Sequence, residues 1–194
     1  MQDFLLYFEI GWQHIMSFEA ADHLLYILSL IALYPFNAVK NILVLITAFT
    51  IGHSLTLILS IVNFIHFNSD WVEFLIPLTI LFTAVFNFYQ QKTLRSNKWI
   101  MPNYFLALAF GVIHGMGFAN SIRFMLADTQ GITLPLFSFN AGLEAAQIAV
   151  VVIMLMLIYS VERIFKIKHT LVTYALSGIS GILAIIMCFE RWPM

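Results

Sequence analysis

Long stretches without charged residues alternate with short clusters of charge along the chain. No Asp, Glu, Lys or Arg occurs at residues 41–69, 74–91, 99–122 or 169–189, and residues 129–161 contain a single one, Glu144. About 20 apolar residues cross a bilayer as a helix. The pattern therefore predicts six membrane-spanning helices, at residues 20–36, 41–63, 72–90, 102–122, 135–160 and 170–189.

The ends of these stretches carry residues that favour helix termini. Pro102 and Pro135 fall in the first turns of two predicted spans, where the missing N–H costs little. Nothing along residues 1–194 resembles a linker, so we expect one all-α transmembrane domain. Residues 1–19 precede the first span, and we expect them to form an outer interfacial or re-entrant segment.

Composition makes a soluble globule untenable. The 194 residues are 61% hydrophobic and 10% charged, whereas a soluble domain carries about a quarter charged residues. The formal net charge of −1 gives no basic footprint for nucleic acid. The expected surroundings of this protein are the lipid bilayer.

Basic residues are distributed unevenly between the two sides of the predicted bundle. One side carries Lys40, Lys92, Arg95, Lys98, Arg163, Lys166 and Lys168. The other side carries only Arg123 and Arg191. Because basic residues accumulate in cytoplasmic loops, we expect both termini to be extracytoplasmic.

Several ionisable residues lie at membrane depth, where insertion of a central charge costs about 2.5–3.5 kcal/mol. The candidate metal ligands are His14, Asp22, His23, His53, His114 and Glu144. The polar residues expected to support them are Ser54, Glu73, Asn140 and Gln147. If both termini face outward, these groups lie near the midplane or in the outer half of the membrane, and one cluster open to the outside is expected.

The residue types in this set are those that bind transition metals. Imidazoles combined with carboxylates suit zinc, nickel, cobalt or iron. Simpler roles remain open at this point: Asp22 and Glu73 stand where helix caps occur, and a buried histidine also hydrogen-bonds a neighbouring helix. Asn140 and Gln147 share one helical face with Glu144.

Four ordered motifs carry a resemblance to a known family. They are Gly11-x-x-His14 with Asp22-His23, Phe49-Thr50-x-x-His53-Ser54, Phe110-Gly111-x-x-His114-Gly115-x-Gly117, and Phe139-Asn140-x-Gly142-x-Glu144. Together they resemble the HupE/UreJ family over about residues 11–147. The match is closer to the HupE/UreJ-like branch, because seven residues separate His14 from Asp22 and Ser121 stands where the hydrogenase-associated members carry Glu.

The resemblance implies a small polytopic protein of the bacterial inner membrane that acts as a secondary permease for nickel or cobalt. By resemblance, His14, Asp22, His23 and His114 fall on the metal-handling positions. The family often accompanies hydrogenase or urease systems, which implies an operon-encoded membrane partner; a homo-oligomer is the other arrangement considered.

Three functions follow from these features. The first is a permease for divalent nickel or cobalt. The second is an intramembrane zinc-dependent hydrolase or acyltransferase acting on a lipid or lipidated substrate, with Asp22 or Glu144 as general base. The third is a small subunit whose buried polar groups only fix helix packing. Resemblance favours the permease, whereas residue chemistry alone does not separate the first two.

Overall fold

The computed structural model describes residues 2–17, 20–62, 64, 67–90, 100–126 and 131–193, without the side chains of 100–102, 120 and 123–126. Across these ranges the chain is all-α. The α-helices are α1 (Gln2–Met16), α2 (Ala21–Ile31), α3 (Val39–Ile61), α4 (Ser69–Gln90), α5 (Ile100–Leu126), α6 (Thr133–Phe165) and α7 (His169–Glu190), and a 3₁₀ turn, η2 (Phe36–Ala38), precedes α3.

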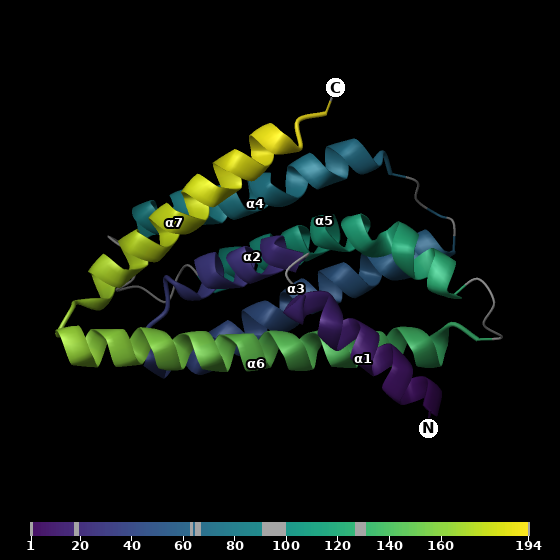
Figure 1. Ribbon diagram of the computed structural model, residues 1–194, viewed down its shortest axis with the longest axis horizontal. Helices are drawn as coiled ribbons and strands as arrows, with labels where there is room; N and C mark the ends of the chain where they lie inside the picture. Colours follow the sequence, from purple (N-terminus) through teal and green to yellow (C-terminus); the bar gives the residue numbers. More distant parts are fainter. Residues whose placement is uncertain are drawn as a thin grey trace.

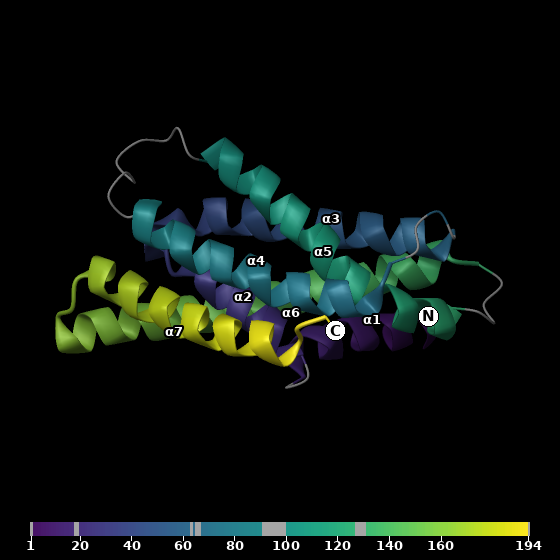
Figure 2. The same ribbon diagram turned by 90° about the horizontal axis from the view of Figure 1, so that it is seen from above.

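Helix α6 runs along the long axis of the molecule, and α1 (Figure 1) and α5 (Figure 2) are tilted against it. The three most extensive packing partnerships join α3 with α5, α1 with α6, and α4 with α7, while α2 contacts α4, α6 and α7. The start of α1, the end of α3, the start of α4, the end of α5 and the start of α6 lie at the same end of the molecule (Figure 1).

Helices α1 and α6 run in the same direction and cross at two glycines (Figure 1). A Cβ on Gly11 would collide with the carbonyl of Phe139, and a Cβ on Gly142 would collide with the carbonyl of Phe8. The two backbones therefore touch directly, which is the use that membrane helices make of small residues.

Helices α3 and α5 also run in parallel, in the direction opposite to α1 and α6 (Figure 1). They repeat the reciprocal contact, because a Cβ on Gly52 would meet the carbonyl of Leu108 and a Cβ on Gly111 would meet that of Phe49. In both crossings, the glycine of each helix contacts a carbonyl three residues before the glycine of the other.

The two crossings correspond to each other when α1 is exchanged with α5 and α3 with α6. Gly11-x-x-His14 in α1 then matches Gly111-x-x-His114 in α5. The remaining partnership, α4 with α7, maps onto itself under the exchange. Because matched helices run in opposite directions, α1–α3–α4 and α5–α6–α7 form an inverted repeat, with α2 inserted in the first half.

Four segments are long and apolar enough to cross a membrane: Phe36–Ile61, Ser69–Gln90, Thr133–Phe165 and His169–Glu190. They overlap four of the six spans expected from the sequence, those at residues 41–63, 72–90, 135–160 and 170–189. The apolar part of α5 within the described side chains, Asn103–Ala119, is shorter. The chain is thus a multi-pass membrane protein.

The first expected span, residues 20–36, is shorter in the structure. Helix α2 ends at Ile31, and the chain turns through Ala32–Tyr34 to Pro35. Proline lacks the N–H that would continue the helical hydrogen bonds, which accounts for the early end. Eleven residues rise about 16 Å, well short of the roughly 30 Å hydrocarbon core.

Residues 2–16, expected to be interfacial or re-entrant, form helix α1. Helix α1 runs towards the start of α2, and both follow the direction of α6 (Figure 1). Together they extend alongside this one long helix, with a break after Met16.

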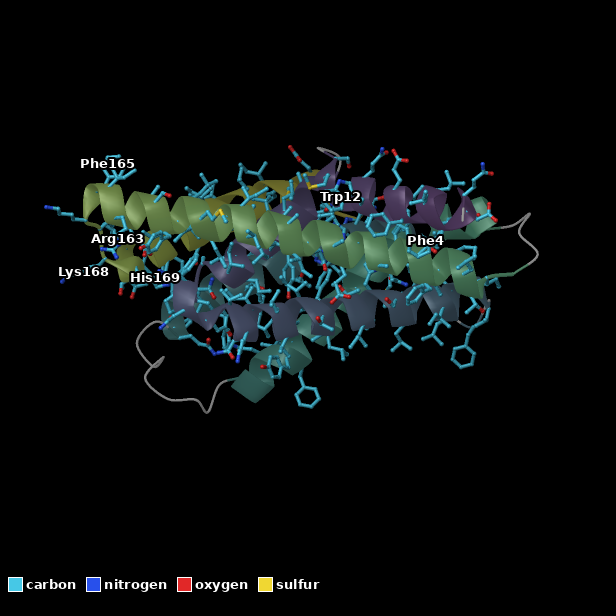
Figure 3. All side chains as sticks on the ribbon, turned by 90° about the horizontal axis from the view of Figure 1, so that it is seen from below. Phe4, Trp12, Arg163, Phe165, Lys168 and His169 are labelled. Atoms are coloured by element: carbon cyan, nitrogen blue, oxygen red, sulfur yellow. The ribbon has the colours of Figure 1, made fainter. Side chains whose placement is uncertain are left out.

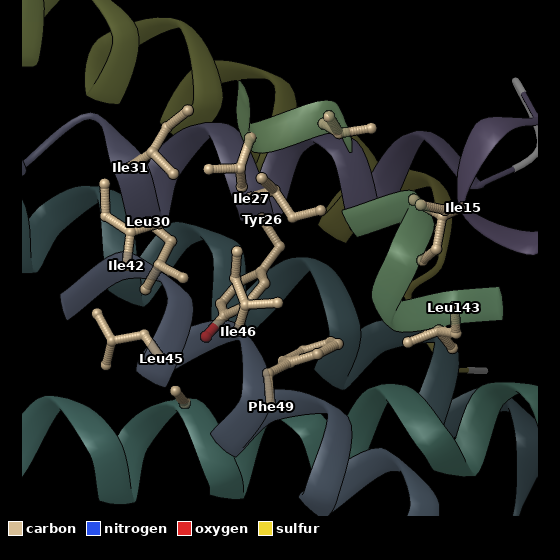
Figure 4. Close-up of a cluster of buried hydrophobic side chains, with 14 of the residues drawn as sticks. Ile15, Tyr26, Ile27, Leu30, Ile31, Ile42, Leu45, Ile46, Phe49 and Leu143 are labelled. Carbon is tan, nitrogen blue, oxygen red and sulfur yellow. The ribbon is translucent and has the colours of Figure 1, made fainter. Parts of the chain in front are cut away.

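Large side chains of α2 and α3 form the centre of the molecule. Tyr26 and Ile27 of α2 pack with Ile46 and Phe49 of α3 (Figure 4). The rings of Tyr26 and Phe49 stack with centroids 4.8 Å apart. This apolar layer lies directly next to the buried histidines.

The described basic residues follow the expected distribution. Lys40 begins α3 at the end of the bundle that holds the α6–α7 connection. Figure 3 shows Arg163 and Lys168 at that end, far from Phe4. Lys92, Arg95 and Lys98 lie outside the described residues, as does the side chain of Arg123.

Candidate metal centre

Three histidines from three helices meet in the interior. His14 ends α1, His23 begins α2 and His53 lies in the middle of α3. One potential ligand nitrogen from each lies within 4.8 Å of the others. His114 of α5 flanks them, with its ring centroid 5.0 Å from that of His23.

Asp22 orients the imidazole of His23. Its Oδ1 lies 2.9 Å from His23 Nδ1 and also accepts the backbone N–H of His23 at 2.8 Å. A carboxylate only accepts hydrogen bonds, so Nδ1 carries the proton and Nε2 keeps a free lone pair. This carboxylate–histidine pair is the arrangement that usually supports a metal ligand.

The second carboxylate oxygen of Asp22 forms an ion pair with Arg191. Arg191, just after α7, places Nη1 3.3 Å from Asp22 Oδ2. The sequence suggested Asp22 as a direct metal ligand. In the structure both of its oxygens contact other residues, His23 and Arg191, and Asp22 is placed to orient His23.

Thr79 of α4 fixes the tautomer of His114. The Thr79 hydroxyl donates to the carbonyl of Ile76 at 2.7 Å, and its oxygen lies 3.1 Å from His114 Nε2. With the hydroxyl proton directed at Ile76, this arrangement favours the tautomer in which His114 Nε2–H donates to Thr79. His114 Nδ1 is left unprotonated and has no partner among the described atoms.

Other ring nitrogens of the group are also buried without partners in the described part of the chain. They are His14 Nε2, His23 Nε2, and both nitrogens of His53. Buried polar atoms are almost always hydrogen-bonded, and an unpaired one costs about 1–3 kcal/mol. A neutral imidazole keeps one unprotonated nitrogen, so the convergence of His14, His23 and His53 fits a divalent transition metal.

Aromatic rings enclose one side of the histidine group. The ring of His14 lies 4.2 Å from that of Phe118, which stacks on Phe139 at 5.1 Å. The ring of Phe139 also faces His53 at 6.4 Å. These rings separate the imidazoles from water on that side.

The histidine group also borders a cavity of about 420 Å³. Its lining residues are His14, Ser17, Ala20, Asp22, His23, Glu73, Ile76, His114, Gly117, Phe118, Ser121 and Arg191. Glu73 lies near the start of α4 and Arg191 follows α7. The cavity therefore opens towards the end of the bundle that holds the α3–α4 connection.

The structure separates Glu144 from the histidines. Its carboxylate accepts a hydrogen bond from Thr47 at 2.8 Å and lines a different cavity, which it shares with Ser54 and Asn140. Gln147 accepts a hydrogen bond from Thr50 in the same region. Of the supporting residues expected from the sequence, only Glu73 lines the histidine cavity.

Sequence reasoning did not identify Thr79 or Arg191 as parts of this centre. Thr79 is an uncharged polar residue in a charge-free stretch at membrane depth, so its position only weakly indicated a functional role. Arg191 looked like a membrane-end residue, and its partner 169 positions earlier is not visible from spacing.

Comparison with known proteins gives one match. A family model described as HupE / UreJ protein matches residues 1–191, essentially the whole chain. The chain belongs to the HupE/UreJ family. The family is related to nickel and cobalt handling, which agrees with the histidine group of this member. Searches of curated proteins and of solved structures found no match.

Proposed function

We propose that this HupE/UreJ protein is a secondary permease that carries a divalent transition metal, nickel or cobalt, across the membrane. The observation that carries the proposal is the convergence of His14, His23 and His53, with unpaired ring nitrogens, beside an open cavity that His14 and His23 line. Borderline imidazole ligands suit nickel, cobalt and zinc. The metal is the substrate here.

The break between α1 and α2 supports transport. We infer that these two helices make one interrupted crossing, since α2 alone is too short to span a bilayer. His14 lies before the break, and Asp22 and His23 lie after it. Secondary transporters commonly build substrate sites at such discontinuous helices.

The inverted repeat supports the same function. Repeats of opposite topology allow one group of helices to rock against another, which exposes a central site alternately to each side. Each half contributes a histidine from a matched position to the metal centre, His14 from α1 and His114 from α5. An enzyme with a fixed site has no comparable need for this symmetry.

A smaller pocket continues the route beyond the histidines. Tyr26 lies 5.3 Å from the ring of His114 and also lines a cavity of about 30 Å³ with Asn87, Asn103 and Tyr34. Asn103 donates to the Tyr34 hydroxyl at 2.7 Å. We infer that Tyr26 closes the path between the open cavity and this inner pocket.

The distribution of Lys40, Arg163 and Lys168 supports an orientation with both termini outside the cytoplasm. The open cavity then faces the extracytoplasmic side, and the transport proposed is import. The bacterial inner membrane is the proposed location, with a homo-oligomer or an operon-encoded membrane protein as the proposed partner.

Metal binding and transport are tested separately. Purified protein titrated with Co²⁺ should develop the visible absorption of a nitrogen-ligated ion, and His53→Ala should greatly reduce it. Proteoliposomes should then accumulate labelled nickel or cobalt. Absence of metal binding by the wild-type protein contradicts the proposal, and so does tight binding without uptake.

One observation favours the second function, a zinc-dependent hydrolase or acyltransferase. Glu73 lines the same open cavity as His14 and His23, where a carboxylate could act as general base towards a metal-bound water. The bases suggested by the sequence are less suitable, since Asp22 is engaged and Glu144 lies elsewhere. Lipid cleavage by zinc-loaded protein, lost in Glu73→Gln, would favour this function.

A further inference from the structure

The side of α3 away from the histidines carries a second cavity, whose mainly apolar lining includes several polar side chains. It has a volume of about 510 Å³ and lies between α3 and α6. Thr47, Thr50 and Ser54 of α3 face Asn140 and Glu144 of α6 across it. Exposed Ile51, Leu55 and Phe137 form its apolar rim. We refer to this feature as the α3–α6 groove.

Most hydrogen-bond donors in the groove are already in use. The Thr47 hydroxyl donates to Glu144 Oε1 and the Thr50 hydroxyl donates to Gln147 Oε1, both at 2.8 Å. Ser54 donates to the carbonyl of Thr50 at 2.7 Å, and the Asn140 amide donates to the carbonyl of Leu136 at 2.9 Å.

Hydrogen-bond acceptors in the groove remain free. Asn140 Oδ1 is buried and has no partner among the described atoms. The oxygens of Ser54 and Thr47 retain lone pairs after donating their protons. None of the described residues that line the groove is basic, although Glu144 supplies a carboxylate. A carboxylate with unpaired oxygen acceptors beside it is suited to bind a cation.

The groove lies at the centre of the inverted repeat. Exchange of α3 with α6 matches Gly52 with Gly142, and therefore Thr50 with Asn140 and Ser54 with Glu144. The four polar residues thus surround the approximate two-fold axis. In inverted-repeat transporters, this central region near the midplane is where coupling ions bind.

We propose that the α3–α6 groove binds a small hard monovalent cation, sodium, held by Glu144, Asn140, Thr47 and Ser54. The ligand set contains only oxygen, which suits hard cations and disfavours nickel and cobalt relative to the histidine centre. A proton bound at this site would require only the Glu144 carboxylate. The unpaired Asn140 Oδ1 offers an additional oxygen ligand, which favours a metal cation over a proton. The role of the sodium ion, coupling to metal import, rests on the proposed function.

Sodium binding to the full-length protein in detergent gives a direct test. Labelled ²²Na⁺ should be retained by the wild type and displaced by unlabelled sodium, but not by choline. Retention should be lost in Glu144→Gln and weakened in Thr47→Val, which removes one oxygen at nearly constant volume. His53→Ala should retain sodium while it loses cobalt.

Cobalt absorption at the histidine centre controls for folding of the groove variants. Loss of both sodium and cobalt binding in Glu144→Gln would indicate that this variant is misfolded. Thr47→Val then serves as the test variant, and it should weaken sodium retention while it preserves the cobalt spectrum. No sodium retention by the wild type, or full retention in Glu144→Gln, overturns the proposal. Sodium binding without metal transport would reject only the permease, and metal uptake that is indifferent to a sodium gradient would reject only the coupling.

Discussion

At the scale of single residues, the metal centre depends on which ring nitrogens are unprotonated. Asp22 holds the proton of His23 on Nδ1, and Thr79 holds that of His114 on Nε2. Each partner leaves the opposite nitrogen available. Such supporting groups commonly change metal affinity about 10–100-fold when they are replaced.

Replacement of Asp22 tests this support. Asp22→Asn keeps the size of the side chain but removes the charge that favours the Nδ1–H tautomer of His23 and pairs with Arg191. Cobalt should bind about 10–100-fold more weakly, as measured by absorption titration. Unchanged affinity would show that Asp22 does not support metal binding through His23, and would leave it with the structural contact to Arg191.

Thr79 offers a test with a matched control. Thr79→Val removes the oxygen that accepts from His114 Nε2, and Thr79→Ser keeps it. The valine variant should weaken cobalt binding about tenfold or more, whereas the serine variant should remain near the wild type. Equal affinities of the two variants would show that the contact of Thr79 with His114 does not support metal binding.

The site was only partly predictable from residues. The structure brings together His14, Asp22, His23, His53 and His114, all recognisable as ionisable groups at membrane depth. Glu144 met the same criterion but faces the other side of α3. Helical spacing places a residue on a face, and it does not identify which neighbour covers that face.

At the scale of helices, the charge-free stretches of the sequence predicted the presence of helices more accurately than the residues at which those helices begin and end. Helices α3 and α7 agree closely with the spans 41–63 and 170–189. Helix α1 was not predicted as a full partner of the bundle, because Asp3, Glu9 and His14 interrupt its apolar pattern. Its packing depends on contact with α6, which local sequence does not reveal.

The glycine crossings lead to a stability prediction. Gly111→Val should force α3 and α5 apart, because even a Cβ would collide with the carbonyl of Phe49. Overpacking of this kind costs about 1–3 kcal/mol, and each kcal/mol lowers the midpoint of thermal unfolding by about 2–4 °C at this size.

Gly178→Val is the matched control for that experiment. A Cβ at Gly178 meets nothing within 4 Å, so its unfolding midpoint in detergent should stay near that of the wild type. Similar losses in both variants would mean that valine in any helix, rather than the α3–α5 crossing, causes the effect.

At the scale of the whole molecule, the proposed import direction depends on orientation. Asn68 and Lys168 are exposed at opposite ends of the bundle, in the connections after α3 and after α6. With Cys188→Ser as background, a cysteine introduced at position 68 should react with a membrane-impermeant maleimide on intact spheroplasts. A cysteine at position 168 should react only after permeabilisation, and the reverse pattern would invert the topology.

Each glycine crossing joins one helix from either half of the chain, and this constrains how the molecule moves. Direct backbone contact makes α1 with α6, and α3 with α5, two stiff bodies. Tilting of one body against the other must then take place along the looser seam where α3 meets α6. Whatever fills that seam acts as a wedge and sets the angle between the bodies, so an ion only a few atoms wide would control displacement of entire helices.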